Sequence, residues 1–192
     1  MADQYGVWSG MPIEEAMGYY ESLYAVGTLS AIHYGVELRP FDENGKIAKS
    51  PDVTLFDNFW LPWLATSIDL SVLDAQSDSA KVGHYQLNYI TGNNSGDIQI
   101  PFIETRAADI LNSAQAIKKI MFAKDGTQAV PSDYLMLMKI FIYDKHSRST
   151  RVFQVDHLVA LQAGSVPLDA TNTNSVAMVQ LNFLKMFPML VD

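Results

Sequence analysis

Cysteine is absent from this chain of 192 residues. Its absence excludes a disulfide framework, a thiolate nucleophile and a metal site with thiolate ligands. Long apolar runs are missing as well, because no window holds the roughly 18 consecutive apolar residues of a membrane-spanning helix. The first residues also lack the basic and apolar regions of a signal peptide. We therefore expect a protein without a membrane segment that is made and kept in the cytosol.

Basic residues are in the minority: 13 Lys and Arg against 21 Asp and Glu give a formal net charge of -8. An acidic chain repels phosphate, so tight binding of nucleic acid through counterion release is not expected. The remaining composition, 48% hydrophobic and 18% charged, is that of a packed globular protein. A single domain with a terminal extension suits this length.

Motifs of catalysis and cofactor binding are also lacking. Two stretches, Gly6–Gly10 and Gly92–Gly96, have the order G-x-x-S-G and not the G-x-S-x-G of a nucleophile elbow. The four histidines show no metal-binding spacing, no glycine-rich phosphate loop occurs, and Asp42–Gly45 lacks the acidic spacing of a calcium loop. We expect neither an enzyme nor a metal or cofactor site.

The N-terminal stretch predicts a helix followed by a loop. Apolar residues recur at helical spacing from Pro12 to Val26, and Glu14 and Glu15 suit the positive end of the helix dipole. A short extended segment and turn-forming residues follow. We expect residues 1–55 to form an N-terminal extension and residues 56–192 to form a β-rich domain.

Alternating apolar and polar residues predict strands in the second part of the chain. Residues 68–72 and 85–89 each alternate, with one face exposed to water. Residues 91–97 have the composition of a hairpin turn and 98–102 alternate again, so an antiparallel pair is expected there. Further strands are expected over 134–143, 151–161 and 176–183.

One long helix interrupts the strands. Thr105 is placed to cap a helix over residues 106–122. Its apolar residues form one stripe, made of Ile110, Leu111, Ala114, Ile117, Ile120 and Met121. Strands, one helix and then strands again predict an α+β fold, an antiparallel β-sandwich or barrel-like domain with one main helix over an edge or end.

Two further patterns concern surfaces. Phe59, Trp60 and Trp63 crowd around a proline and belong to the aromatic types enriched in interface cores, which predicts a subunit contact. Uncharged polar residues occupy one face of several strands, namely Gln86, Asn88, Gln180 and Asn182. Simple solvent exposure explains these polar faces, and the wall of a water-filled channel is the second interpretation.

From about residue 59 onwards the chain resembles the tail tube proteins of contractile bacteriophages, a family that also includes the haemolysin-coregulated protein of type VI secretion. The resemblance rests on the order of elements: an early strand pair, one helix, then a long strand with its partner. The end of the chain carries most of it, because the small-residue and proline loop Ala163–Asp169 precedes a last alternating strand over Val176–Phe183.

This resemblance implies a structural virion protein, six copies of which form a ring whose inner strands join into one barrel. Rings stack into the inner tube of a phage tail, assembled in the host cytoplasm, and the tape measure protein and DNA pass through it without tight binding. The implied partners are further copies of the chain, tail sheath proteins and baseplate proteins. The resemblance places at a subunit boundary Val166, Pro167 and Leu168, and Gln86, Asn88, Gln180 and Asn182 are then candidates to face the lumen.

The N-terminal third departs from this pattern, because simple tube subunits are shorter. The departure leaves open a baseplate tube-initiator ring of the same fold, and a secretion tube shares that fold too. We expect the extension to clamp a neighbouring subunit. A barrel that binds a small apolar ligand is a further alternative, and its mark would be a monomer with an enclosed cavity of about 300–1,000 Å³.

Overall fold

The computed structural model describes residues 12–14, 17–18, 20–21, 32–56, 64–70, 75–93, 96–144, 151–168 and 176–187. Its strands are β1 (Tyr34–Pro40), β2 (Ala75–Val82), β3 (Tyr85–Asn93), β4 (Asp97–Ile103), β5 (Met136–Tyr143), β6 (Arg151–Ser165) and β7 (Met178–Lys185). Its helices are α2 (Lys46–Lys49), the 3-10 helix η1 (Thr54–Phe56), α4 (Asp109–Met121) and α5 (Pro131–Tyr134). The paired strands are all antiparallel, so the predicted α+β class is confirmed.

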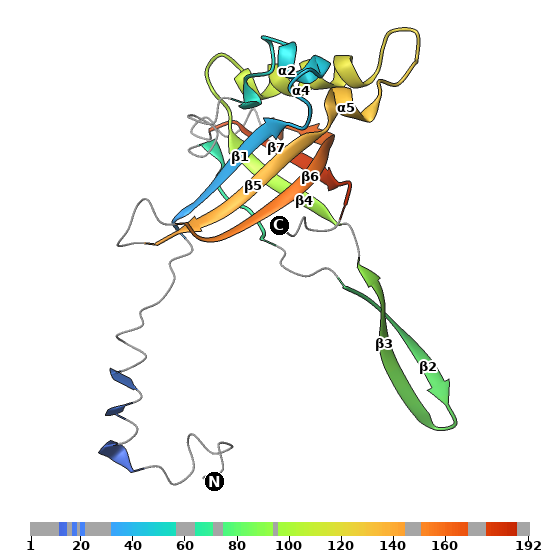
Figure 1. Ribbon diagram of the computed structural model, residues 1–192. Helices are drawn as coiled ribbons and strands as arrows, with labels where there is room; N and C mark the ends of the chain where they lie inside the picture. Colours follow the sequence, from blue (N-terminus) through green and yellow to red (C-terminus); the bar gives the residue numbers. More distant parts are fainter. Residues whose placement is uncertain are drawn as a thin grey trace.

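Five strands form one curled sheet in the order β1-β5-β6-β7-β4, and α2, α4 and α5 gather at one end of it (Figure 1). Alternation separates a core face from a polar face in β4 and in β7, where Val179, Leu181 and Phe183 are buried, whereas Leu158, Val159 and Ala160 of β6 are all buried. All five strands of the curled sheet contribute side chains to one core, and Ile110 and Ile117 of α4 pack into it. Here the predicted strand alternation is confirmed.

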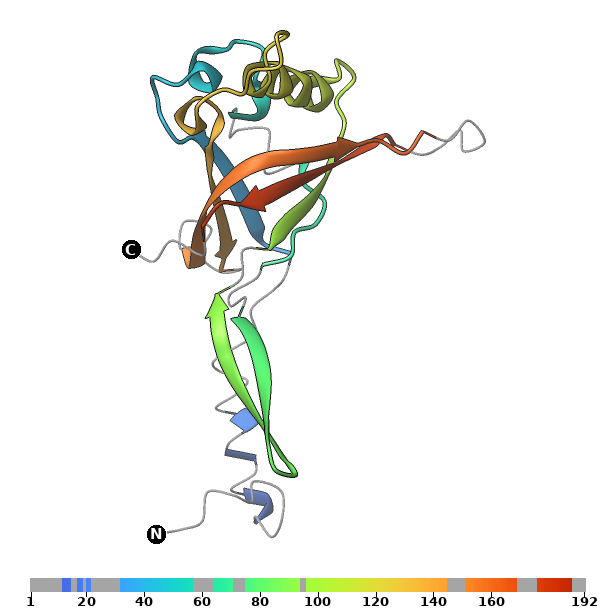
Figure 2. The same cartoon turned by 90° about the vertical axis from the view of Figure 1, so that its right-hand side faces the viewer.

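The β6 strand is longer than predicted and ends at Ser165. Its register with β7 shifts between Leu161 and Ala163, which marks a β-bulge. Figure 2 shows that the ends of β6 and β7 beyond this shift extend past the rest of the sheet. The bulge therefore separates a packed part of this strand pair from a projecting part.

The long helix begins later than predicted. It starts at Asp109 because Ala108 adopts a left-handed conformation with φ 58°. The Glu104 carboxylate accepts hydrogen bonds from the amides of Ile110 and Leu111, at 3.1 and 3.0 Å. Oγ1 of Thr105 accepts from the amide of Asp109 at 3.1 Å, so this threonine serves the first turn from outside the helix.

The predicted hairpin between residues 85–89 and 98–102 is wrong. β3 pairs with β2 through a turn at Gly83, whose φ is 65°, and β4 pairs with the last strand, β7. The sequence of β2, Ala-Gln-Ser-Asp-Ser-Ala-Lys-Val, shows no apolar alternation because none of its residues is buried. Of the strand predicted over residues 68–72, residues 68–70 lie outside the strands, and residues 71–72 lie outside the described residues.

Residues 32–55, which were assigned to the extension, pair and pack with the sheet. β1 forms a seven-residue ladder with β5, and Val36, Leu38 and Ile47 are fully buried in the common core. In the predicted helix 12–26, the described residues 13–14, 17–18 and 20–21 are helical and exposed, and the others lie outside the described residues. Where the domain begins stays a prediction. Within the described residues, no helix is long and apolar enough to cross a membrane.

Candidate assembly surfaces

The β2–β3 hairpin presents an apolar face to solvent. In its register Val82 lies opposite Tyr85 and Ala80 opposite Leu87, and Tyr89 lies next along the same face, opposite Asp78. Tyr85 is 69% exposed and Leu87 is 57% exposed. Figures 1 and 2 both show this hairpin projecting away from the five-stranded sheet. Because an isolated two-stranded hairpin is only marginally stable in water, a partner is expected to cover this face.

The opposite face of the hairpin is mostly polar, although Ile90 lies on it opposite Ser77 and is exposed. Lys81 lies opposite Gln86 and Ser79 opposite Asn88. Both of these predicted lumen residues are exposed, and they lie on a different sheet from Gln180 and Asn182. The structure thus assigns the four predicted residues to two separate polar surfaces.

The polar face of the five-stranded sheet, the side opposite its core, holds the second pair. Nε2 of Gln180 on β7 donates a hydrogen bond to Oε1 of Gln99 on β4, at 2.9 Å. Asn182 follows on the same face and is half-buried. This half of the polar face carries uncharged amides, as the sequence predicted for it.

The other half of the polar face carries an ion-pair network that sequence reasoning missed. A guanidinium nitrogen of Arg151 on β6 lies 2.8 Å from Oε1 of Glu37 on β1, and the guanidinium also stacks 4.4 Å from the centre of the Phe141 ring. Nζ of Lys139 on β5 lies 3.0 Å from Oδ2 of Asp156 on β6. The register predicts the Lys139–Asp156 pair, because these two residues stand opposite each other, but the sequence alone does not give that register.

Side-chain hydrogen bonds join the two ion pairs. Gln154 accepts from Arg151 at 3.1 Å and donates to Asp156 at 2.8 Å. Over the five strands as described, three basic and three acidic side chains share this face, namely Arg39, Lys139 and Arg151 with Glu37, Asp97 and Asp156. Each of the three cations lies within 4 Å of a carboxylate oxygen, since Arg39 is 3.6 Å from Glu37. The face is therefore charge-balanced although the chain is acidic.

The predicted boundary loop begins where β6 ends. Val166 packs against the core, while Pro167 and Leu168 are exposed at the end of the projecting strand pair. The aromatic residues Phe59, Trp60 and Trp63 lie outside the described residues. Their assignment to a subunit interface stays a prediction.

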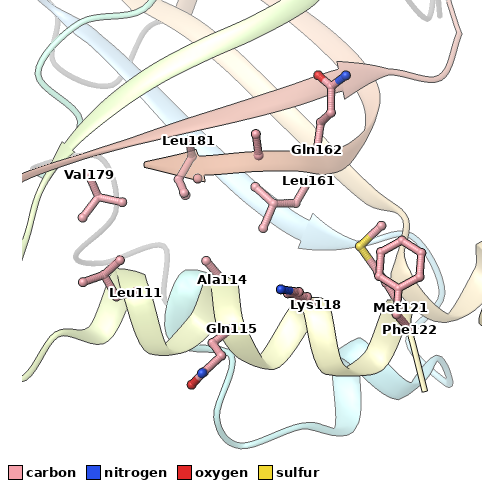
Figure 3. Close-up of a pocket in the computed structure, with 12 residues that line it drawn as sticks. Leu111, Ala114, Gln115, Lys118, Met121, Phe122, Leu161, Gln162, Val179 and Leu181 are labelled. Atoms are coloured by element: carbon pink, nitrogen blue, oxygen red, sulfur yellow. The ribbon is translucent and has the colours of Figure 1, made fainter. Parts of the chain in front are cut away.

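A groove lies between α4 and the strands β6 and β7 (Figure 3). Its volume is about 410 Å³, and its lining is mostly apolar, with Leu111, Ala114 and Met121 on the helix side and Leu161 and Leu181 on the strand side. The predicted helix stripe explains it, because only Ile110 and Ile117 of that stripe are fully buried and Leu111 stays exposed. Unlike the enclosed cavity of a ligand-binding barrel, this groove is partly open to solvent.

Titratable groups with shifted pKa values lie away from these surfaces. A hydrogen bond with the Lys46 side chain holds the pKa of Asp133 below its ordinary value, where the ion pair of 3.0 Å ties α2 to α5. A hydrogen bond from the Thr127 hydroxyl lowers the pKa of Asp125 in the turn after α4. Among the residues that the structure describes, no group of three or more His, Asp or Glu side chains is placed to hold a metal ion. These shifts report turn and helix contacts.

Comparison with known proteins identifies the fold. No protein-family model matches the sequence, and no curated protein matches it. A solved chain from the sheath-tube complex of the extracellular contractile injection system PVC, in the extended state, matches 90% of this chain and 97% of its own length at a TM-score of 0.53 and 8% identity. A chain from the PVC sheath/tube terminator, also extended, matches 85% of this chain and 97% of its own at a TM-score of 0.51 and 8% identity. The chain shares the fold of these assembly components.

Proposed function

We propose that this chain is a structural subunit that forms rings in the inner tube of a contractile injection system, in the manner of a phage tail tube. The observation that carries the proposal is the apolar face of the β2–β3 hairpin, which is exposed in the single subunit of a fold shared with sheath-tube components. An exposed apolar face on a projecting hairpin is the mark of a surface that another chain covers.

Ring closure would also pair the backbone groups at the edges of the sheet. β1 and β4 are its edge strands, and the outer side of an edge strand offers backbone groups for pairing. Part of the β4 edge is already used, because the Thr66 amide donates to the Pro101 carbonyl at 2.9 Å and Ala65 bridges to Phe102. Joining adjacent subunits, six by the family resemblance, through their edges and hairpins would turn separate sheets into a closed barrel.

The polar face of the five-stranded sheet is the proposed wall of the lumen. Its arginine and lysine side chains are held by Glu37 and Asp156, so they are poorly available to phosphate. A charge-balanced wall would let DNA and a tape measure protein pass without tight binding. In this proposal Gln180 and Asn182 line the same passage, and the virion tail is the location of the assembled tube.

The N-terminal segment favours a specialised ring as the second candidate, such as a tube initiator on a baseplate. Ile13 and Met17 are exposed apolar residues that lie outside the core of the sheet. They offer an additional contact that the stacking of identical rings into a tube does not require. An initiator should form single rings, whereas a tube subunit should form rings that stack. Sheath and baseplate proteins are the proposed partners in either role.

Native mass spectrometry and negative-stain microscopy of the full chain test the proposal. Hexameric rings, alone or stacked, are expected at high protein concentration. A protein that stays monomeric at every concentration, and also in the presence of preformed tubes, would contradict it. A monomer that takes up a small apolar molecule in the groove beside α4 would support the ligand-binding alternative.

A further inference from the structure

The groove beside α4 is an apolar surface with a basic margin. Leu111 and Phe122 expose apolar atoms along it, and Lys118 takes part in its lining (Figure 3). Lys119, the next residue, lines a different hollow together with Thr54, Asp109 and Asn112, and Lys124 comes three residues after the end of the helix. All three lysines are exposed, and none forms an ion pair with another described residue. The groove thus suits an apolar ligand with acidic groups at its edge.

The N-terminal segment has the complementary chemistry. Ile13, Met17 and Tyr20 are 79%, 59% and 69% exposed, and their spacing places them on one stripe of a helix. The same spacing places Glu14 and Glu21 together on one flank of that stripe. Residues 1–31 contain four acidic side chains, Asp3, Glu14, Glu15 and Glu21, and no Lys or Arg. An amphipathic helix of this kind lays its apolar face into an apolar groove.

The two surfaces lie at opposite ends of the subunit. In Figures 1 and 2 the described residues of the segment lie beyond the sheet end that is farthest from α4. The chain enters the sheet at Tyr34, and β1 then runs towards the helices (Figure 1). In a stack of rings, a segment that leaves this end reaches the neighbouring subunit's helices before its own.

We infer that the groove between α4 and the strands β6 and β7 binds the acidic N-terminal segment of a second copy of this chain. Ile13, Met17 and Tyr20 enter the groove, and the glutamates of the segment face Lys118. The inference rests on the proposed ring assembly and names the place where the N-terminal clamp is held. Both partners belong to the same sequence, so each subunit places its N-terminal segment on one neighbour and binds the segment of another. The same contact therefore repeats from ring to ring.

Disulfide trapping in the full chain tests the contact, since the chain has no cysteine of its own. Two singly substituted proteins, Met17→Cys and Ala114→Cys, are mixed under assembly conditions and oxidised. A covalent dimer of the two is expected. Asn112→Cys in place of Ala114→Cys is the matched control, because Asn112 is exposed on α4 but does not line the groove, and it should give no dimer.

Charge exchange gives an independent test. Lys118→Glu and Glu14→Lys/Glu21→Lys should each raise the concentration needed for assembly, by about tenfold or more, and a mixture of the two proteins should restore it. Rings that assemble without the disulfide and without this rescue would overturn the inference and leave the proposed function standing. A wild-type chain that never assembles would overturn both. A disulfide that forms only within a chain carrying both cysteines would show docking in the same copy and overturn the inference.

Discussion

Gly35 and Phe141 face each other across the β1–β5 ladder, and the Phe141 ring fills the space where any other residue at position 35 would place its Cβ. The ring cannot easily move away, because Tyr143 packs edge-on against it at 4.9 Å and the Arg151 guanidinium covers it. The glycine therefore lets an aromatic ring lie flat on the polar face, where it supports the ion-pair network.

Gly35→Ala should lower the free energy of unfolding by about 1–3 kcal/mol, because an added methyl group forces a packed ring and its neighbours to shift. Urea denaturation measures the change. Gly92→Ala is the matched control, since a Cβ there meets nothing within 4 Å, and it should change stability by less than about 0.5 kcal/mol. Equal effects of the two substitutions would contradict this packing argument.

Glu37→Gln should release Arg39 and Arg151 from their shared carboxylate. The loss of stability should be about 1 kcal/mol, because these arginines are partly exposed and surface ion pairs contribute little. The affinity of assembled protein for DNA should rise and should fall again with salt, since free cations gather phosphate. Fluorescence anisotropy of labelled DNA at two salt concentrations measures both effects, and unchanged binding would argue against the polar face as the lumen wall.

Leu87→Asp should impair assembly without weakening the subunit, because this side chain lies on the apolar face of the projecting hairpin. Its thermal unfolding should stay close to that of the wild type, as for other exposed positions. Asn88→Asp introduces the same charge one residue further on, on the polar face of the hairpin, and should assemble much better. Should both variants form rings like the wild type, the hairpin would have no part in the interface.

Tyr34→Phe should cost about 0.5–1.5 kcal/mol, since the Tyr34 hydroxyl donates a hydrogen bond of 3.0 Å to the Ala65 carbonyl. Burial raises the pKa of Tyr34 above its ordinary value of 10.0. A raised pKa in the folded state means that this stabilisation is complete below pH 10 and is lost as the pH rises through the folded-state pKa. The difference in unfolding free energy between the two proteins should therefore shrink in strongly alkaline solution, and a pH-independent difference would exclude this linkage.

Alternation predicted those strands that have one buried face. Val179, Leu181 and Phe183 alternate with polar residues, so β7 was visible in the sequence, and the helix stripe revealed α4. β2 was invisible because the hairpin buries no face within the subunit, so its residues carry no core pattern. Alternation can also come from an exposed apolar face, as in β3, where Tyr85, Leu87 and Tyr89 alternate with polar residues although none of the three is buried.

Which strands pair with one another was predicted less well from the sequence than where the strands lie. Residues 98–102 alternate and follow a turn-like stretch, so local chemistry favoured a hairpin with β3, whereas the structure pairs β4 with β7 across a long sequence separation. The ion pair of Glu37 with Arg151 depends on the same kind of information, because the two residues meet only when β1 and β6 flank β5. The start of α4 was missed for a different reason, since the Glu104 carboxylate caps the helix from outside the usual capping position.

The strand order also determines when, during synthesis, each strand can find its partner. Tyr34–Pro40 and Asp97–Ile103, the first two strands of the main sheet to leave the ribosome, both find their partners in strands translated later, Met136–Tyr143 and Met178–Lys185. Contacts of such long sequence separation form slowly and only after the last partner has emerged. A nascent subunit therefore leaves both of these strands without their partners until the later strands have been translated.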